Sequence, residues 1–341
     1  MKKVLVIGAG SWGSALAIVL ADNGYDVRIW GRRKEQIDEI NERHTNEKYL
    51  PNIVLPTNIV AYSDFKEAVK DIDTVLIVVP SSAIRETVKR LKEAVDRPLT
   101  IIHASKGIEP KTHKRISEII EEELEGTSLL KEIVVLSGPS HAEEVSLRQP
   151  TTVTVSSKNK EAAEKVQDMF MNKNFRVYTN LDLIGVEIGG ALKNIIAIAC
   201  GLTHGLGYGD NSKAAIMTRG LAEITRLGTK LGANRHTFAG LSGLGDLIVT
   251  CTSTHSRNYR AGILIGQGKS VDEVLQSMGM VVEGVRTTMA TYELARKLEV
   301  DMPITFALYD VLFSGLSPKA AAEELMGRVK KHEMESLSAE N

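Results

Sequence analysis

A glycine-rich turn near the amino terminus is the feature that most constrains the fold of this chain. Gly8, Gly10 and Gly13 follow the β-branched run Lys3–Ile7 and open an apolar helical segment that starts at Ser11. A strand, this glycine spacing and a helix together are typical of a unit that binds a dinucleotide. Gly8 permits the tight turn, Gly10 lets the pyrophosphate approach, and Gly13 lets the helix pack on the sheet. The alternative is a tight turn that holds no ligand.

Short apolar runs alternate with segments of helical periodicity through the first half of the chain. The runs, which predict strands, cover residues 3–7, 26–30, 74–79, 99–103, 133–136 and 151–155. Helical periodicity lies between several of them, as at residues 83–95 and 112–124. Continuous apolar runs suit strands that are covered on both faces, and the alternation favours a mostly parallel, doubly wound sheet.

The pattern changes after residue 180, where strand signals become rare. Helical patterns then cover residues 182–200, 211–231, 270–279, 286–298 and 317–324. A chain of 341 residues is longer than one hydrophobic core usually supports. We therefore expect an α/β domain of Rossmann type in residues 1–180 and an all-α domain in residues 181–341.

Composition excludes several classes of partner and site. The net charge of −1 gives no general affinity for nucleic acid, so an acidic ligand needs a local cluster of bases. Cys200 and Cys251 have no C-x-x-C partner, and the histidines lack metal-ligand spacing, so we expect neither a disulfide framework nor a metal site. No run of 18 uncharged apolar residues appears, so we expect no membrane insertion and a cytoplasmic protein.

Two arginines follow the second predicted strand, at the position that selects between the two nicotinamide dinucleotides. An NAD-selective site often places Asp or Glu here to bind the ribose 2′-hydroxyl, whereas this chain has Gly31, Arg32 and Arg33. The arginines can pair with a 2′-phosphate or stack on adenine. Both NAD and NADP are therefore allowed as cofactor. The alternative is a pair of solvated arginines in a loop.

Lys193 is the only charge in a long apolar helical run of the second half. Its neighbours on the same helix face are Gly189, Gly190 and Ala197, which predict space beside the ammonium for a ligand. Desolvation lowers the pKa of a buried lysine toward the range that suits a general acid or base. The alternative is a lysine that reaches from a buried helix to water.

Two further residues are candidates because of their position after predicted elements. Lys106 follows the strand at 99–103, and ligands of open α/β sheets bind at the carboxyl ends of strands. Asp246 is the one acid in a glycine-rich segment, where it can orient Lys193 or bind a substrate hydroxyl. The alternatives are a solvated loop lysine and a turn or helix-capping aspartate.

Ser256, Arg257 and Asn258 place a hydroxyl, a guanidinium and an amide at successive positions. Such a cluster suits a phosphate group. A loop that caps the next helix explains it equally well. The turn that contains Ser140 and His141 also follows a predicted strand and is a candidate for the wall of the same cleft.

Six motifs together resemble those of bacterial-type glycerol-3-phosphate dehydrogenase that uses NAD(P). They are GAGSWGSALA, SKGIE, SGPSHAEEV, GGALKNIIAIACG, LSGLGDLIVTCTSTHSRN and VVEG, and they run in the expected order from residue 8 to residue 284. The resemblance implies reduction of dihydroxyacetone phosphate to sn-glycerol 3-phosphate, a precursor of phospholipids. It also implies a cytoplasmic protein that takes a small-molecule substrate and is often a homodimer.

The resemblance also implies roles for individual residues. Lys193 matches the general acid/base, and we expect Asp246 to share the catalytic site with it. Positions that match cofactor contacts are Ser11, Trp12, Arg32, Arg33, Lys106, Ala142, Arg257 and Glu283. Positions that match substrate contacts are Lys106, Gly138, Ser140, Lys193, Asp246, Ser256, Arg257 and Asn258.

Two alternative functions remain open at this point. Hydroxyacyl-CoA, 6-phosphogluconate and ketopantoate dehydrogenases also join a Rossmann domain to a helical one. The cluster at residues 256–258 favours a small phosphate ester over their substrates. A non-catalytic nucleotide sensor is the other alternative, and a lysine enclosed among glycines argues against it because a sensor needs no buried base.

Overall fold

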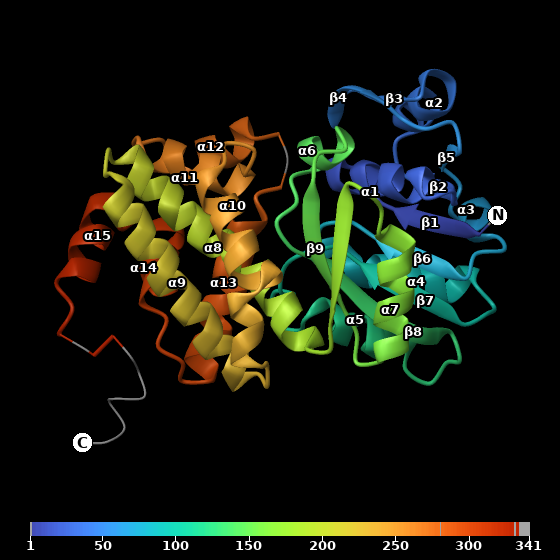
Figure 1. Ribbon diagram of the computed structural model, residues 1–341. Helices are drawn as coiled ribbons and strands as arrows, with labels where there is room; N and C mark the ends of the chain where they lie inside the picture. The colour runs from blue at the N-terminus through green and yellow to red at the C-terminus, as the bar shows by residue number, and fades with distance from the viewer. Residues whose placement is uncertain (1, 280, 331, 334–341) are drawn as a thin grey trace.

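The computed structural model describes residues 2–279, 281–330 and 332–333 of the chain. A sheet covered by helices forms one half of the molecule, and packed helices form the other (Figure 1). The expected fold class is thereby confirmed. The last strand of the sheet ends at Asn180 and the first helix of the second half begins at Leu183. We propose to divide the domains between residues 180 and 181.

Eight strands form the main sheet, in the order β10-β9-β8-β7-β6-β1-β2-β5. All neighbouring strands are parallel except β8 and β9. The strands are β1 (Lys3–Ile7), β2 (Asp26–Trp30), β5 (Ile59–Tyr62), β6 (Thr74–Ile77), β7 (Leu99–His103), β8 (Leu130–Ser137), β9 (Thr151–Ser156) and β10 (Phe175–Asn180). A separate antiparallel pair consists of β3 (Thr45–Asn46) and β4 (Leu50–Val54).

Helices cover both faces of the sheet, which explains why its central strands are continuously apolar. The helices of this half are α1 (Ser11–Asp22), α2 (Lys34–Arg43), α3 (Phe65–Val69), α4 (Ile84–Ala94), α5 (Ile116–Leu124), α6 (Ala142–Ser146) and α7 (Lys160–Phe170), with a short 3₁₀ turn η1 (Ser81–Ala83). The core of one face includes side chains of α1, α6 and α7, and that of the other includes α3, α4 and α5. In α4 the buried residues Ile84, Val88 and Leu91 recur at helical spacing.

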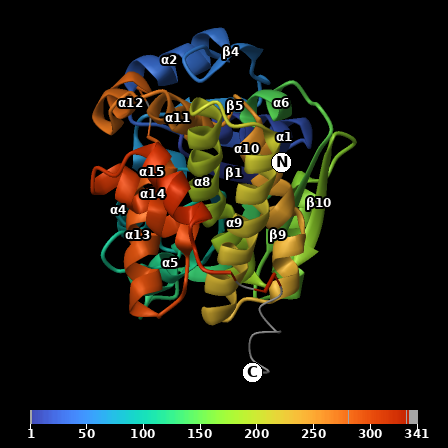
Figure 2. The same cartoon turned by 90° about the vertical axis from the view of Figure 1, so that its left-hand side faces the viewer.

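Helix α8 (Leu183–Gly205) is the centre of the helical half. It packs against α9 (Asp210–Lys230), α10 (Asp246–Thr252), α11 (Arg257–Gly266), α13 (Glu283–Lys297) and α14 (Pro303–Phe313). Seen from the helical side, α13, α14, α8 and α9 run roughly side by side (Figure 2). The remaining elements are η2 (Arg235–Ala239), η3 (Leu241–Gly245), α12 (Val271–Ser277) and α15 (Pro318–Met326).

Glycines bring α8 and α11 into backbone contact. A Cβ on Gly201 would lie 2.1 Å from the carbonyl oxygen of Tyr259, and one on Gly262 would lie 2.2 Å from that of Ile198. Neither helix can move away without losing this close packing. The contact therefore fixes the amino-terminal end of α11 relative to the side chains that α8 carries.

The structure adds elements that the sequence pattern did not predict. All six predicted strands are present, but the edge strands β5 and β10 and the helices α2, α7 and α14 were missed. β10 alternates buried and exposed residues because it lies at the edge of the sheet, and it therefore lacks a continuous apolar run. The helix expected from residue 112 begins at Ile116, because Lys111 and His113 adopt positive φ angles of 70° and 58°.

Helix α8 is the one helix among the described residues that is long and apolar enough to cross a membrane by length and composition. Its mean hydropathy is 1.7 over an 18-residue window, and 94% of that window is buried inside the protein. Its apolar surface is therefore explained by its central place in the helical half.

Candidate functional site

A cleft of about 560 Å³ lies where the helical half meets the carboxyl ends of the central strands. The strand order reverses between β1 and β6, and open α/β sheets bind ligands outside such a switch point. Segments that follow β1, β6, β7 and β8 form one wall, and α8, α10 and α11 contribute to the other. The predicted residues that line it are Gly10, Ser11, Trp12, Gly13, Arg32, Lys106, Ser140, Ala142, Lys193, Asp246, Ser256, Arg257, Asn258 and Glu283.

The glycine turn is built as its spacing predicts. Gly8 has a φ of 124°, and a Cβ there would lie 2.3 Å from the carbonyl oxygen of Val78. A Cβ on Gly13 would lie 1.9 Å from the carbonyl oxygen of Gly8, so α1 rests directly on the turn. A Cβ on Gly10 would meet nothing within 4 Å, and Gly10 lines the cleft. Gly8 and Gly13 are thus required by the fold, while Gly10 keeps the cleft open.

The amino-terminal end of α1 presents unused donors to this space. Helix α1 has no side-chain cap and no acidic residue in its first turn. The backbone N–H groups of Ser11 and Trp12 have no acceptor within the part of the chain that the structure describes. Free N–H groups and the helix dipole together make such an end a site for an anion such as a phosphate.

The two arginines after β2 have different surroundings. Arg32 is exposed and lines the cleft. Arg33 does not line it, because its guanidinium donates to Gln36 Oε1 at 3.0 Å and lies 5.2 Å from the ring centroid of Tyr49. Arg32 is therefore the more available of the two for a ligand.

Lys106, Asp246 and Lys193 form a buried trio of charges that joins the two halves. Lys106 Nζ donates to Asp246 Oδ2 at 2.8 Å, and Lys193 Nζ donates to Asp246 Oδ1. Lys193 also donates to Thr250 Oγ1 at 2.8 Å, one turn along α10 from Asp246. The trio holds two cations and one anion, so it carries an excess of positive charge beside the cleft.

Burial and charge change the titration of this trio. Burial lowers the pKa of Lys193 to about 7, with a further contribution from Lys106 and against the attraction of Asp246. Burial alone would raise the pKa of Asp246, but the two ammonium groups hold it below its ordinary value. Asp246 is therefore an anion at neutral pH, while Lys193 exchanges a proton readily.

The glycines beside Lys193 have a different role from the one expected. A Cβ on Gly189 would lie 2.6 Å from the carbonyl oxygen of Ser242, and one on Gly190 would lie 2.7 Å from Ser137 Oγ. The expectation that they leave space for a ligand is wrong at both positions, because the backbone of η3 and a side chain of β8 occupy that space. These glycines instead allow η3 and β8 to approach α8 closely.

Ser256, Arg257 and Asn258 lie at the amino-terminal end of α11. Ser256 Oγ accepts from the N–H of Tyr259 at 3.2 Å. Ser256 therefore caps α11, as the alternative interpretation of this cluster expected. The Asn258 amide donates to Asn194 Oδ1 and accepts from the N–H of Gly284, each at 2.9 Å. The side chains of Ser256 and Asn258 are therefore already engaged in local structure.

Arg257 and the first backbone N–H groups of α11 remain available. Within the described residues Arg257 forms no ion pair or hydrogen bond, and burial lowers the pKa of its guanidinium. The N–H groups of Arg257 and Asn258 have no acceptor there either. A half-buried cation beside two free donors at a helix start is suited to an anion.

The remaining predicted residues shape the rim of the cleft. Gly138 does not line it: its φ is 140°, and a Cβ would lie 3.0 Å from Val153 Cα. Ser140 Oγ donates to the carbonyl oxygen of Gly138 at 2.9 Å. Glu283 accepts from the N–H of Ser81 at 3.2 Å and from Ser81 Oγ at 2.9 Å, so it joins α13 to the segment after β6.

Several residues of the cleft were missed by sequence reasoning. They are Tyr49, Asn194, Thr250 and His255, and His141 was noted only as part of a turn. The spacing of four between Asp246 and Thr250 on one helix face was a usable signal. Nothing in the sequence indicates that Tyr49, in the segment between β3 and β4, reaches the same cleft.

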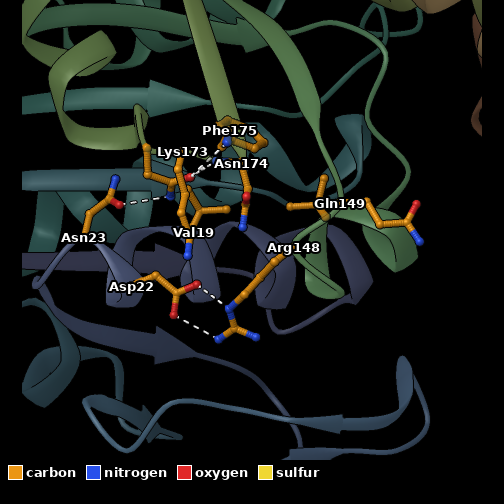
Figure 3. A pocket seen from close by; sticks show the side chains of 10 residues that line it. Val19, Asp22, Asn23, Arg148, Gln149, Lys173, Asn174 and Phe175 are labelled. Carbon is orange, nitrogen blue, oxygen red and sulfur yellow. Dashed lines mark hydrogen bonds and ion pairs between the residues drawn. The ribbon is translucent and has the colours of Figure 1, made fainter.

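A second hollow of about 400 Å³ lies on the sheet domain, between the end of α1, the end of α6 and the segment before β10 (Figure 3). Two of its charged groups pair with each other, since Arg148 donates twice to the Asp22 carboxylate, at 2.7 and 2.9 Å. Asn172 donates to Asn23 Oδ1 at 3.0 Å. These groups are satisfied by the protein itself and identify no ligand.

Metal-ligating groups do not cluster in the described residues. No group of three or more His, Cys, Asp or Glu side chains is placed there to hold a metal ion. Cys200 and Cys251 are free and buried. The ionisable side chains that line the cleft are those of lysine, arginine, histidine, aspartate, glutamate and tyrosine.

Comparison with known proteins identifies the family of this chain. Residues 3–163 match a sequence model described as NAD-dependent glycerol-3-phosphate dehydrogenase N-terminus, and residues 182–323 match its C-terminus counterpart. The chain is 69% identical over 337 residues to glycerol-3-phosphate dehydrogenase (NAD(P)+) of Shouchella clausii, with 99% of each chain covered. A crystal structure of glycerol-3-phosphate dehydrogenase from Coxiella burnetii superposes with a TM-score of 0.91 at 39% identity, covering 96% of this chain and 99% of that one.

Similarity to other dehydrogenases extends only to the fold. A ketopantoate reductase of Ralstonia eutropha gives a TM-score of 0.59 at 15% identity, covering 94% of this chain and 99% of that one. The matches to both halves and the identity over nearly the full length are specific to one family. The chain therefore belongs to the NAD(P)-dependent glycerol-3-phosphate dehydrogenase family of oxidoreductases.

Proposed function

We propose that the protein transfers a hydride between NAD(P)H and dihydroxyacetone phosphate, with sn-glycerol 3-phosphate as the product. One observation carries this proposal: the Lys106–Asp246–Lys193 trio and the unpaired Arg257 line the same cleft as the glycine turn. The cleft thereby brings together a candidate proton donor in Lys193, a cation in Arg257 and the amino-terminal end of α1, which suits a phosphate. The relatives named above carry the same activity in their names.

The residues around the glycine turn fit a dinucleotide. The free N–H groups at the start of α1 and the space beside Gly10 suit a pyrophosphate. Arg32 is placed to meet a ribose 2′-phosphate, and no carboxylate occupies the end of β2, so both NAD and NADP are accommodated. We assign cofactor contacts to Gly8, Gly10, Ser11, Trp12, Gly13, Arg32, Arg33, Lys106, Ala142, Arg257 and Glu283, with Gly8 and Arg33 acting through the shape of the turn.

The start of α11 fits the phosphate of the substrate. Arg257 and the N–H groups of Arg257 and Asn258 provide charge and donors that no group in the described part of the chain uses. The phosphate is remote from the reacting carbon, so its binding energy can orient the ketone. We assign substrate contacts to Lys106, Gly138, Ser140, Lys193, Asp246, Ser256, Arg257 and Asn258, with Gly138 and the Asn258 side chain shaping the site.

Lys193 is the proposed general acid of the reduction. Bound NAD(P)H supplies the hydride. The Lys193 ammonium stabilises the negative charge that develops on the ketone oxygen and then donates its proton there. Asp246 holds the ammonium in place together with Thr250. In the reverse direction the neutral amine accepts the hydroxyl proton.

Three parts of the proposal rest on the family resemblance alone. They are action in the cytoplasm, supply of glycerol phosphate for phospholipid synthesis, and assembly as a homodimer. Gel filtration with light scattering tests the dimer directly.

A steady-state assay of cofactor oxidation tests the proposed function. Dihydroxyacetone phosphate is offered with NADH and, separately, with NADPH, beside ketopantoate and acetoacetyl-CoA as rival carbonyls. We expect turnover with dihydroxyacetone phosphate to exceed that with the other two. Equal or faster turnover of ketopantoate or acetoacetyl-CoA would contradict the proposed substrate. Tight cofactor binding with no turnover of any of the three compounds would support a nucleotide sensor.

A further inference from the structure

Two histidines, one from each half of the molecule, face each other across the cleft. His141 precedes the first residue of α6 in the sheet domain, and His255 lies between α10 and α11 in the helical domain. Their ring centroids are 5.4 Å apart, with the rings tilted at 50°. Both line the cleft, and none of the steps described above uses either of them. Two rings brought together from separate domains need an explanation.

His141 has an unsatisfied polar atom. Its Nε2 is buried and has no hydrogen-bond partner within the described part of the chain. Native proteins rarely leave such an atom unpaired, because losing hydration without a partner costs about 1–3 kcal/mol. His141 Nε2 therefore has one unused hydrogen-bonding position, which a ligand in the cleft reaches when the ring turns toward it.

The charge around His141 is mixed. Lys193 of α8 acts on it from one side, and Glu143 and Glu144 of α6 act on it from the other. Burial lowers the pKa of His141, the charges of Lys193 and His255 lower it further, and Glu144 and Glu143 act against them. His141 is therefore neutral at pH 7 before an anion arrives.

The sequence position of His255 identifies the kind of anion. His255 lies one residue before Ser256, which caps α11, and two before the unpaired Arg257. The free N–H groups at the start of α11 lie in the same short segment. A phosphoryl group held at this helix start would therefore lie beside a residue that directly follows His255 in the chain.

We propose that His141 and His255 act as one phosphate-binding pair that determines the preference for a phosphorylated substrate. The inference rests on the proposed function and adds to it. The phosphate dianion attracts one proton from solvent onto His141, and ring N–H groups of His141 and His255 then donate to the phosphoryl oxygens. Because the rings belong to different domains, the bound phosphate also ties the two walls of the cleft together.

Proton uptake follows from electrostatics. A dianion within about 4–6 Å of an imidazole raises its pKa, and the second pKa of a phosphate monoester is about 6. Binding near pH 7 therefore draws a proton from the buffer. As pH rises this proton on His141 is lost, so affinity for the phosphorylated substrate falls.

The first test is steady-state kinetics of His141→Gln, His255→Gln and the double variant. Glutamine keeps a donor and an acceptor but cannot become a cation. We expect each single change to raise KM for dihydroxyacetone phosphate about tenfold, the effect of one charge-assisted hydrogen bond, with kcat nearly unchanged. Dihydroxyacetone, which lacks the phosphate, should show no change in kcat/KM. His236→Gln is the matched control, since His236 is exposed and does not line the cleft.

The second test is calorimetric titration with inorganic phosphate in two buffers of different ionisation enthalpy. The wild type should take up more protons per phosphate bound than the double variant. Unchanged KM and unchanged proton uptake in the variants would overturn the inference. It would also be overturned by equal losses with dihydroxyacetone, or by a matching loss of NADPH affinity, because either places the pair at another part of the ligands. Wild-type turnover of dihydroxyacetone phosphate decides the proposed function separately.

Discussion

Two buried clusters of charge join the sheet domain to α8, and they differ in how completely they are satisfied. One is the Lys106–Asp246–Lys193 trio beside the cleft. The other is centred on Glu187, six residues earlier on the same helix, and includes His103, Arg115 and Ser117. His103 ends β7, while Lys106 follows that strand by three residues, so the two clusters connect the same pair of elements.

The carboxylate at the centre of the Glu187 cluster is saturated. It accepts from Arg115 at 2.5 Å, from the N–H of Ser117 at 2.8 Å and from Ser117 Oγ at 2.7 Å, and His103 Nε2 lies 3.1 Å away. Burial alone would raise the pKa of Glu187, but His103, Arg115 and Ser117 lower it to about 2. The oxygen atoms of the Glu187 carboxylate therefore have no free acceptor position for a ligand.

The trio beside the cleft is incomplete by comparison. It has one anion for two cations, and Arg257 nearby has no ion-pair partner among the described residues. The comparison teaches that burial of charge does not by itself identify a functional site. The cluster beside the cleft differs because it has excess positive charge, and because free hydrogen-bond donors line the same cleft.

The largest expected effect is on catalysis at the incomplete cluster. Lys193→Ala should lower kcat by about 10²–10⁴-fold, the range for loss of one general acid. Asp246 keeps Lys106 as its partner, so we expect no large change in the thermal midpoint. Stopped-flow turnover and differential scanning calorimetry measure the two quantities. Near-normal turnover with intact NADPH binding would refute the role of Lys193.

The saturated cluster should respond in the opposite way. Glu187→Ala leaves the buried N–H and hydroxyl of Ser117 without an acceptor and removes one of the two carboxylates paired with Arg115, which should lower the free energy of unfolding by about 1–3 kcal/mol. Urea denaturation measures this, with Glu86→Ala as control because its pair with Arg90 is exposed and contributes about 0–1 kcal/mol. A loss of kcat larger than that of Lys193→Ala, with stability retained, would reverse the comparison.

Two glycines extend the comparison to backbone packing. Gly189→Ala places a Cβ 2.6 Å from a backbone carbonyl and should lower stability by about 1–3 kcal/mol. Gly10→Ala meets no protein atom within 4 Å, so it should leave stability unchanged and weaken NADPH binding. Chemical denaturation and fluorescence titration of both variants separate the effects. Equal stability losses would show that Gly10 is also a packing position.

The two clusters should also titrate in separate pH ranges, which is the smallest effect. Because the pKa of Lys193 is lowered to about 7, its protonated form is lost above pH 7, and ketone reduction should fall about tenfold per further unit. Oxidation of the alcohol, which needs the neutral amine, should rise through the same range until it levels off.

The Glu187 contribution behaves differently with pH. Its pKa is lowered from 4.5 to about 2, so its stabilising effect is complete above pH 4.5 and is lost as pH falls toward 2. Thermal melts from pH 3 to pH 8 measure this in wild type and Glu187→Gln. Two curves that stay parallel down to pH 3 would contradict it.

Much of the fold follows from local pattern, and the exceptions have a physical cause. The six central strands are apolar because both faces are covered, so their runs can be read directly. β5 and β10 lie at the two edges of the sheet, where one side of the strand is unpaired and polar residues are tolerated. An edge position depends on the order of strands, which the sequence pattern does not encode.

The candidate site was predictable in its residues but not in its contacts. Lys193 and Asp246 were identified from the sequence, but their contact spans 53 positions and depends on how α10 packs on α8. The role of Gly189 and Gly190 was misjudged because close approach of η3 and β8 is a tertiary property. His141 and His255 come together across 114 positions, and no local signal indicates such a pair.

The central place of α8 has a consequence for biosynthesis. Every helix that covers it, α9, α10, α11, α13 and α14, is encoded after it. The ribosome needs on the order of 10 s to extend the chain from residue 205 to residue 297. During that time the apolar segment that forms α8 lacks most of the helices that later bury it. We therefore expect the nascent chain to bind chaperones that shield exposed apolar segments. The charged residues of α8, Glu187 and Lys193, disfavour its insertion into a membrane.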